Sequence, residues 1–91
     1  MPPPPPTPRP WIEKLEPNKG AAGSVSLAFT VWGGGFSATS VIVFDGNPQT
    51  TTFTNATRLD CALTLGPSVG ERLVFVRDGA QSSDTMVFTV I

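Results

Sequence analysis

The feature that most constrains the fold of this chain is a two-residue alternation of apolar and polar side chains. From Val25 to Val31 the odd-numbered residues are large and apolar, and Ser, Ala and Thr lie between them. Because successive side chains of a strand point to opposite faces, this alternation is typical of a half-buried β-strand. Further apolar runs lie at residues 41–44, 58–65, 73–76 and 86–91, with weaker ones at 11–15 and 49–53.

Turn sequences separate these runs. Asp45-Gly46-Asn47-Pro48 follows the run at 41–44, and Arg77-Asp78-Gly79-Ala80 joins the last two runs. Asp-Gly favours the left-handed conformations that tight hairpin turns need. No segment shows a convincing helical periodicity. Seven short strands with regular turns therefore predict an all-β fold, an antiparallel β-sandwich.

A sandwich buries one face of each sheet, and the alternation indicates which side chains point inward. Cys61 lies in register with Leu59 and Leu63, so we interpret it as a small buried apolar residue rather than a reactive thiol. Phe36 follows the three glycines that end a strand, and we expect it to fill the core under that turn. The predicted core consists of Leu27, Phe29, Ile42, Phe44, Leu59, Cys61, Leu63, Val74, Val76, Phe88 and Val90.

Proline dominates the first ten residues, which hold seven of the ten prolines. Consecutive prolines have fixed φ angles and lack N–H donors, so we expect an extended polyproline II arm over residues 1–10 and a sandwich over residues 11–91. The arm is either a solvated spacer or a segment that docks on a partner, with Arg9 pairing with a carboxylate there. The candidate partner-binding residues are Pro2, Pro3, Pro4, Pro5, Pro6, Pro8, Arg9, Pro10 and Trp11.

Composition excludes several function classes. The chain has no histidine and one cysteine. Histidine-dependent nucleophile systems, ordinary structural zinc sites and intrachain disulfides therefore cannot form within one chain. The carboxylates at expected turns and strand rims are interpreted as solvated, so we predict no enzyme, no catalytic residue, no metal site and no cofactor. These carboxylates are Asp45, Asp60, Glu71, Asp78 and Asp84.

The charge pattern also limits the partners. The formal net charge is −1 and basic residues do not cluster, which argues against nucleic acid. No apolar run approaches the roughly 20 residues of a membrane span, and no apolar leader segment follows Met1. We therefore expect a gene product made in the cytosol, with a protein as its partner.

Several segments now fall into a familiar order. Pro10–Gly20 reads PWIEKLEPNKG, Thr30–Phe36 reads TVWGGGF and Val43–Pro48 reads VFDGNP, and the segments Asn55–Leu59 and Val74–Gly79 follow. Together these segments, over residues 10–91, resemble IPT/TIG domains, with Asp45 where that family more commonly has glycine. The resemblance implies an immunoglobulin-like sandwich that serves as an interaction or structural module, and it does not fix the function.

Two functions remain open. We favour a structural protein of a virion, assembled in the host cytoplasm, because a Pro-rich arm before an Ig-like sandwich is similar to the plan of bacteriophage capsid decoration and tail proteins. Its partner would be a capsid or other assembly lattice, or a second copy. The alternative is a carbohydrate-binding module, at a cell surface as part of a larger protein. Trp32 is then the ligand platform, because alternation places it on the face opposite to Phe29.

Overall fold

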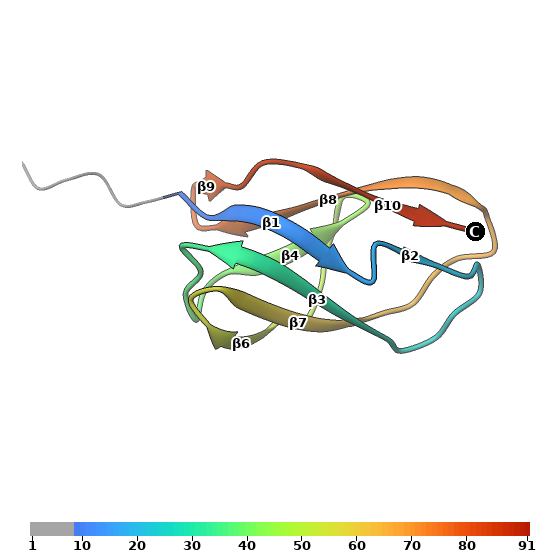
Figure 1. The fold of residues 1–91 in the computed structure, drawn as a ribbon, viewed down its shortest axis with the longest axis horizontal. Coiled ribbons are helices and arrows are strands. Elements are labelled where there is room, and N and C mark those ends of the chain that lie inside the picture. The colour runs from blue at the N-terminus through green and yellow to red at the C-terminus, as the bar shows by residue number, and fades with distance from the viewer. Residues whose placement is uncertain (1–8) are drawn as a thin grey trace, which may run out of the picture.

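Ten strands are present in residues 9–91, the part of the chain that the structure, a computed structural model, describes. They form two sheets that pack face to face (Figure 1). The strands are β1 (Trp11–Glu16), β2 (Lys19–Gly20), β3 (Leu27–Gly34), β4 (Val41–Phe44), β5 (Asn47–Pro48), β6 (Thr52–Asn55), β7 (Arg58–Leu63), β8 (Gly70–Asp78), β9 (Gln81–Ser82) and β10 (Met86–Val90). The chain therefore has the all-β sandwich fold that its alternation predicts.

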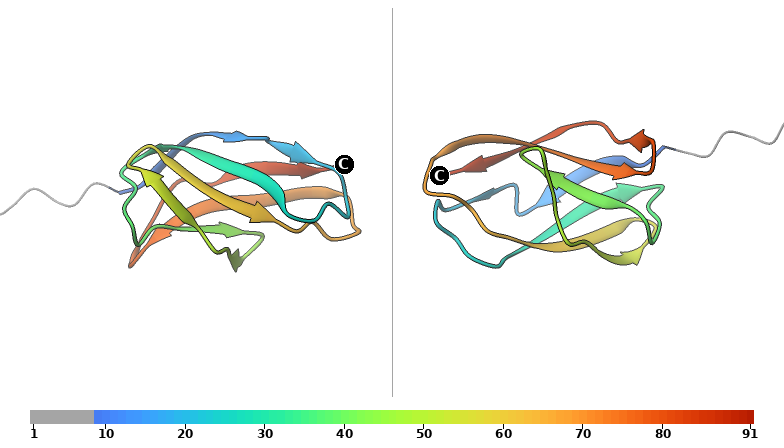
Figure 2. Two further views of the ribbon diagram at one scale, coloured as in Figure 1. Left: turned by 90° about the horizontal axis from the view of Figure 1, so that it is seen from below. Right: turned by 180° about the vertical axis from the view of Figure 1, so that it is seen from behind.

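The two sheets differ in size. The first sheet has the order β1–β3–β7–β6, and its pairs are antiparallel. The second has the order β2–β10–β8–β4–β5, and the short β9 pairs with β8. Views from below and from behind show the two layers (Figure 2). β2 runs parallel to β10, so the chain passes from the first sheet to the second after β1, at the cis peptide bond Glu16–Pro17.

The seven predicted strands are confirmed, but several of their boundaries differ by up to three residues. β3 begins at Leu27 rather than Val25, because Ser26 has a φ of 55°, which no extended strand can accommodate. The weak strand expected at 49–53 begins only at Thr52. The Gln49 N–H still donates to the Ile42 carbonyl in the second sheet (2.8 Å), so the chain is crossing between sheets at that point. The two-residue strands β2, β5 and β9 are too short to show an alternation of apolar and polar side chains.

The core lies between the two sheets. Phe88 makes edge-to-face contacts with Phe29 and Phe44, at centroid distances of 5.5 and 5.4 Å. Nine of the eleven predicted core residues are buried, and so is Phe36. The prediction is wrong for Leu27 and Cys61, which are only partly buried because they lie at the margin of the core cluster. The buried hydrophobic residues missing from the predicted list are Ile12, Leu15, Val31, Val43 and Leu65.

The turn after β4 explains the departure from glycine at position 45. Asp45 and Gly46 have φ angles of 50° and 79°, so both central residues of the β4–β5 hairpin turn are left-handed. Two consecutive left-handed residues define the turn that best matches the twist of paired strands, and Asp tolerates this conformation. Asp45 therefore replaces glycine without losing the hairpin.

Candidate interaction site

The Pro-rich segment leads into one end of the sandwich. Pro2, Pro3, Pro4, Pro5, Pro6 and Pro8 lie outside the described residues. Arg9 is exposed, whereas Pro10 is buried. A Cβ at Gly35 would lie 2.9 Å from the Arg9 carbonyl oxygen and 3.3 Å from the Pro10 Cα, so the backbone at Arg9 and Pro10 packs closely against the end of β3. The point at which the segment leaves the sandwich is therefore fixed.

Trp11 is the first aromatic residue after this point, and it is 51% exposed. It pairs with Gly34 across β1 and β3. A Cβ at Gly34 would lie 2.6 Å from the Cε2, Cζ2 and Nε1 atoms of the indole, so the ring rests on the space that the glycine leaves free. The adjacent Gly33 has a different role, because a Cβ there would overlap the Trp11 carbonyl oxygen. These two glycines let β1 and the Trp11 ring approach β3 closely.

Trp32 lies on the outer face of the first sheet, on β3, and it is half-buried. Its register partners are Lys14 on β1 and Arg58 on β7. The Lys14 Nζ is 5.7 Å and the Arg58 Cζ 5.1 Å from the ring centroid, and the indole N–H donates to Glu16 Oε2 at 3.0 Å. Cation–π contacts from both neighbouring strands therefore occupy the ring, and it is not a bare platform.

Asp60 extends this arrangement toward the edge strand β6. Its carboxylate accepts hydrogen bonds from Thr30 Oγ1 (2.7 Å), from Thr54 Oγ1 (2.6 Å) and from the Arg58 guanidinium (3.1–3.2 Å). Burial on its own would raise the pKa of Asp60, but the hydrogen bonds from Arg58, Thr54 and Thr30 outweigh it and lower that pKa below its usual value. The carboxylate is therefore charged at neutral pH and holds Arg58 against Trp32.

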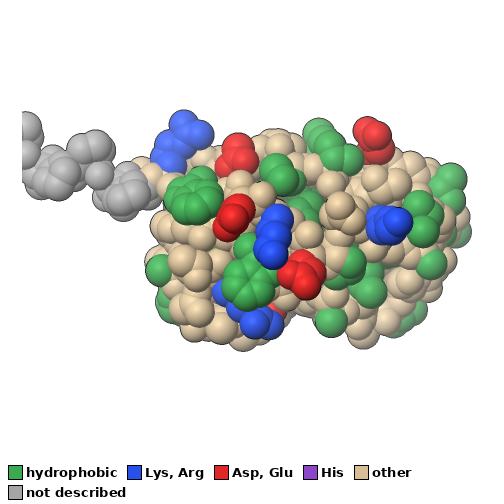
Figure 3. Space-filling model, viewed as in Figure 1, with side chains coloured by type: hydrophobic (Ala, Val, Ile, Leu, Met, Phe, Trp, Pro, Cys, Tyr) green, Lys and Arg blue, Asp and Glu red, His purple; other side chains and the backbone are tan. Residues whose placement is uncertain are grey.

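We call these outward residues the tryptophan face: Trp11, Lys14, Trp32, Arg58 and Asp60. Figure 3 shows how acidic and basic side chains gather around hydrophobic ones on this side of the molecule, near the end where the Pro-rich segment enters. The sequence analysis predicts Trp11 and Trp32 as site residues. It does not predict Lys14, Arg58 and Asp60 as their neighbours, because only the strand register brings these residues beside Trp32.

Two of the remaining carboxylates, Asp78 and Asp84, are hydrogen-bond acceptors, which corrects the expectation that they are simply solvated. Asp78 accepts hydrogen bonds from the hydroxyls of Ser37, Thr39 and Ser40, and these bonds lower its pKa although burial opposes them. Asp84 Oδ1 accepts from the Ile12 N–H at 2.9 Å, which ties β1 to the loop before β10. Asp45 and Glu71 are exposed, and neither carboxylate accepts a hydrogen bond within residues 9–91, although Asp45 Oδ2 lies 3.7 Å from Arg72 Nε.

Cys61 is half-buried on β7. Burial, with a smaller contribution from the Asp60 charge, raises the pKa of its thiol to about 11. The thiol is therefore protonated at neutral pH and is a poor nucleophile. Within residues 9–91 no group of three or more Cys, Asp or Glu side chains is placed to hold a metal ion, and no helix there could cross a membrane.

A cleft of about 330 Å³ lies near the other end of the sandwich, between the β4–β5 turn and the loop before β8. Arg72 lines it together with Asp45, Asn47 and Gln49. The Arg72 guanidinium already donates to the Ser68 and Glu71 carbonyl oxygens at 3.0 Å and lies 3.7 Å from Asp45 Oδ2. Because these contacts occupy the guanidinium, the cleft offers little charge for an anionic ligand.

The comparisons with known proteins agree with this architecture. No family model and no curated protein matches the chain. Among solved structures, the TIG domain from human nuclear factor of activated T-cells, cytoplasmic 4, matches with a TM-score of 0.74 and 19% identity, over 91% of this chain and 88% of that chain. A putative phosphatase from Bacteroides thetaiotaomicron matches with a TM-score of 0.60 and 18% identity, over 91% of this chain but only 18% of that chain. The fold is therefore that of a TIG-type immunoglobulin-like domain, as the sequence segments led us to expect.

Proposed function

We propose that this chain is a non-enzymatic interaction module that docks on a larger protein assembly through its Pro-rich segment and its tryptophan face. The observation that carries the proposal is the position of Trp11. It is a large exposed aromatic residue held on a glycine, directly after the buried Pro10 at which the segment leaves the sandwich. A partner that binds the segment therefore meets Trp11 next.

The chemistry of the two parts suits docking. Prolines have fixed φ angles, so a proline run loses little conformational entropy when it binds. Tryptophan is among the residues that dominate the binding energy of interfaces, because its large ring is buried on association. Lys14, Arg58, Glu16 and Asp60 surround Trp32 with charges of both signs, as is common at the polar rim of an interface.

The class of assembly that we favour is a virion shell built in the host cytoplasm. A Pro-rich segment before an Ig-like sandwich is similar to the plan of bacteriophage decoration and tail proteins. On a repeating lattice, many weakly bound copies would gain from multivalency and neighbour contacts. The alternative is that this chain is one module of a larger cell-surface protein.

Co-sedimentation tests the docking proposal. Tagged versions of the full chain, of residues 11–91 and of the Trp11→Ala variant are expressed in the source cell, and particles of high mass are pelleted. We expect the full chain in the pellet and the two altered chains mainly in the supernatant. Val25→Ala is the matched control, because Val25 is 74% exposed just before β3 begins, at the other end of that strand from Gly34, and should not affect pelleting. Equal pelleting of all four chains, or of none, would overturn the proposal.

Carbohydrate binding remains the second candidate function, and the exposed Trp11 ring favours it, since sugars stack on open aromatic faces. Tryptophan fluorescence is titrated with soluble glucans and chitin fragments. A saturable shift that Trp11→Ala abolishes, in a chain that does not pellet with particles, would replace the assembly proposal with this one.

A further inference from the structure

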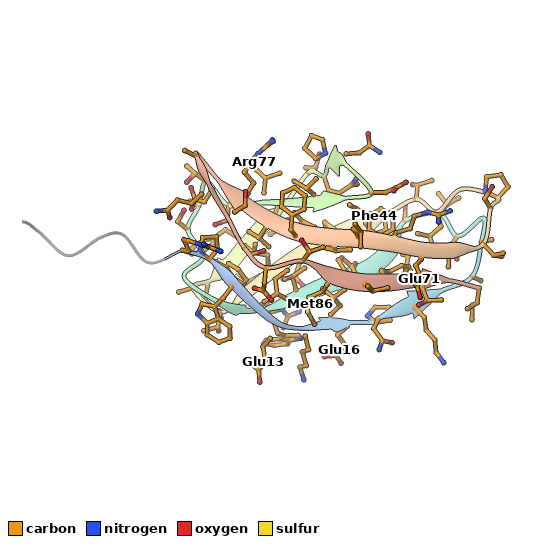
Figure 4. The ribbon with its side chains drawn as sticks, turned by 90° about the horizontal axis from the view of Figure 1, so that it is seen from above. Glu13, Glu16, Phe44, Glu71, Arg77 and Met86 are labelled. Carbon is orange, nitrogen blue, oxygen red and sulfur yellow. The ribbon has the colours of Figure 1, made fainter. Side chains whose placement is uncertain are left out.

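The outer face of the second sheet is unusually apolar. Along β8 the side chains of Glu71, Leu73, Phe75 and Arg77 point outward, while Val74 and Val76 point into the core. Leu73 is 58% exposed although it lies in the middle of the strand. Figure 4 shows Glu71 and Arg77 toward the two ends of β8. Two apolar side chains thus lie between an acidic and a basic one on a single strand.

A neighbouring strand widens this apolar surface. Val87 on β10 is the register partner of Leu73 and is 46% exposed. Val43 on β4 is the register partner of Phe75, but its side chain is buried. We call Leu73, Phe75 and Val87, with Glu71 and Arg77 at the ends, the β8 face. It differs from the tryptophan face, where charged and hydroxyl side chains surround the aromatic rings.

We expect a binding partner to bury an apolar outer face of this kind. The solvated side of a sheet normally carries polar residues at its outward positions, and contiguous exposed apolar patches mark interaction sites. The charges at the ends of the face are also uncompensated. Neither the Glu71 carboxylate nor the Arg77 guanidinium has a hydrogen-bond or ion-pair partner in the part of the chain that the structure describes.

We propose that the β8 face binds the same face of a second copy of this chain in a two-fold symmetric dimer. Glu71 and Arg77 lie at equal sequence distances from Val74, and so do Leu73 and Phe75. A two-fold axis that passes over Val74 and makes the two β8 strands antiparallel therefore sets Glu71 of each copy opposite Arg77 of the other. It also sets Leu73 opposite Phe75. The face is thus complementary to itself, as a two-fold interface requires.

The charges also select between the two ways of stacking the face on itself. If the two β8 strands ran parallel, Glu71 would oppose Glu71 and Arg77 would oppose Arg77. Like charges in an interface are unfavourable by several kcal/mol, whereas the antiparallel arrangement pairs opposite charges at both ends. Only the antiparallel dimer buries the apolar side chains at the centre and also pairs opposite charges at both ends.

The size of the face indicates how tight the dimer is. Nine residues at about 3.3 Å each make β8 about 30 Å long, and three neighbouring strands span about 14 Å. This footprint, about 400 Å² on each copy, is below the roughly 800 Å² per partner of a standard specific interface and suits a weak one. We therefore expect a weak, reversible dimer. The interface uses the sheet opposite to the tryptophan face, so it does not depend on the proposed docking function.

Sedimentation equilibrium at several concentrations tests the dimer. The full chain should show a monomer–dimer equilibrium, and residues 11–91 should show the same one, because the Pro-rich segment takes no part. Leu73→Asp should be monomeric at all concentrations. Val25→Asp is the matched control, because it adds the same charge at an exposed apolar residue away from the β8 face, and it should leave the equilibrium unchanged.

Charge exchange tests the orientation. Glu71→Arg alone places like charges at both ends of the antiparallel dimer and should raise the dissociation constant about tenfold. Arg77→Glu alone should have a similar effect, and the double exchange should restore the original constant. A chain that stays monomeric at every concentration, a dimer that persists in Leu73→Asp, or a dimer lost in residues 11–91 would overturn the proposal. Failure of the double exchange to restore binding would overturn the antiparallel pairing.

Discussion

The indole of Trp11 rests on Gly34, at a position where a Cβ would be 2.6 Å from three ring atoms. This contact fixes an exposed tryptophan at the end of the sandwich where the Pro-rich segment enters. The contact is possible because residue 34, on the neighbouring strand β3, is a glycine and has no Cβ. The contact between Trp11 and Gly34 thus links the local sequence to the proposed docking surface.

Alanine at Gly33 and at Gly34 should have different effects. At Gly33 the new Cβ would overlap backbone atoms of Trp11, so we expect a loss of about 1–3 kcal/mol in the free energy of unfolding. At Gly34 it would meet the far end of a side chain, which can swing away. Gly34→Ala should therefore shift the tryptophan emission with little loss of stability. Denaturant unfolding and fluorescence spectra measure both, and equal destabilisation by the two variants would contradict this account.

Removal of Arg58 should abolish one cation–π contact of Trp32 and the hydrogen bonds from the guanidinium to Asp60. Arg58→Ala loses the cation–π contact and the hydrogen bonds to the carboxylate, so the pKa of Asp60 should rise from its lowered value. The carboxyl carbon chemical shift of Asp60, followed by NMR against pH, measures this change. Lys14→Ala is the control, because Lys14 contacts the same ring but not Asp60. An unchanged Asp60 titration in Arg58→Ala would show that the guanidinium does not set this pKa.

Asp78 should make the fold sensitive to acid. Hydroxyls of Ser37 and Thr39 hold its pKa in the folded chain below the unfolded value of 3.8. The stabilisation is therefore fully present above about pH 4 to 5, and it is lost as the pH falls through the lower folded-state pKa. Asp78→Asn should be less stable at pH 7 and should show a flatter decline of stability below pH 4. Urea unfolding between pH 2 and pH 7 measures both curves, and parallel curves would rule out this role of Asp78.

Asp84 should hold the first strand in place. Its carboxylate is the acceptor for the Ile12 N–H, and a hydrogen bond to a charged acceptor contributes about 1.5–3 kcal/mol. Asp84→Ala should lower stability by an amount toward the lower end of this range and should speed hydrogen exchange at the Ile12 amide. Asp84→Asn keeps an acceptor oxygen and should have the smaller effect. Unchanged exchange at Ile12 in Asp84→Ala would contradict the assignment.

Cys61 should react slowly in the folded chain. Burial raises the pKa of its thiol to about 11, so little thiolate is present at pH 7 to 8. Alkylation by iodoacetamide should be slow at that pH, should accelerate as the pH approaches 11 and should become fast in urea. Fast alkylation of the folded chain at pH 7 would show that the thiol is open to solvent.

Alternation and turn chemistry were sufficient to predict the sandwich, because both are local properties of a strand. Phe29, Ile42 and Phe88 are buried as their positions in the pattern indicate. Ile12 and Leu15 were missed since they are three residues apart, and the pairing of β1 with β3 is irregular between Ile12 and Lys14. That irregularity shifts the inward face by one residue, which no two-residue pattern reveals.

The surroundings of the candidate sites could not be predicted in the same way. Trp11 and Trp32 stand out as rare residues, but their contacts come from distant segments. Arg58 reaches Trp32 only through strand register. Alternation along β8 alone places Glu71 and Arg77 at the ends of one face, but register is needed to place Val87 beside Leu73. Register depends on long-range packing, so the sequence alone indicates the tryptophans and not the charges that surround them.

Site-specific photo-crosslinking tests the docking proposal most directly. A photoreactive residue replaces Glu13, which lies exposed beside Trp11 on β1 and points away from the second sheet (Figure 4). In a second chain it replaces Val25, which lies just before β3 begins, at the other end of that strand from Gly34. In the source cell we predict one discrete high-mass adduct from position 13, lost when residues 1–10 are removed, and none from position 25. Adducts from position 25 alone, or equal adducts that persist without the Pro-rich segment, would contradict the proposed docking surface.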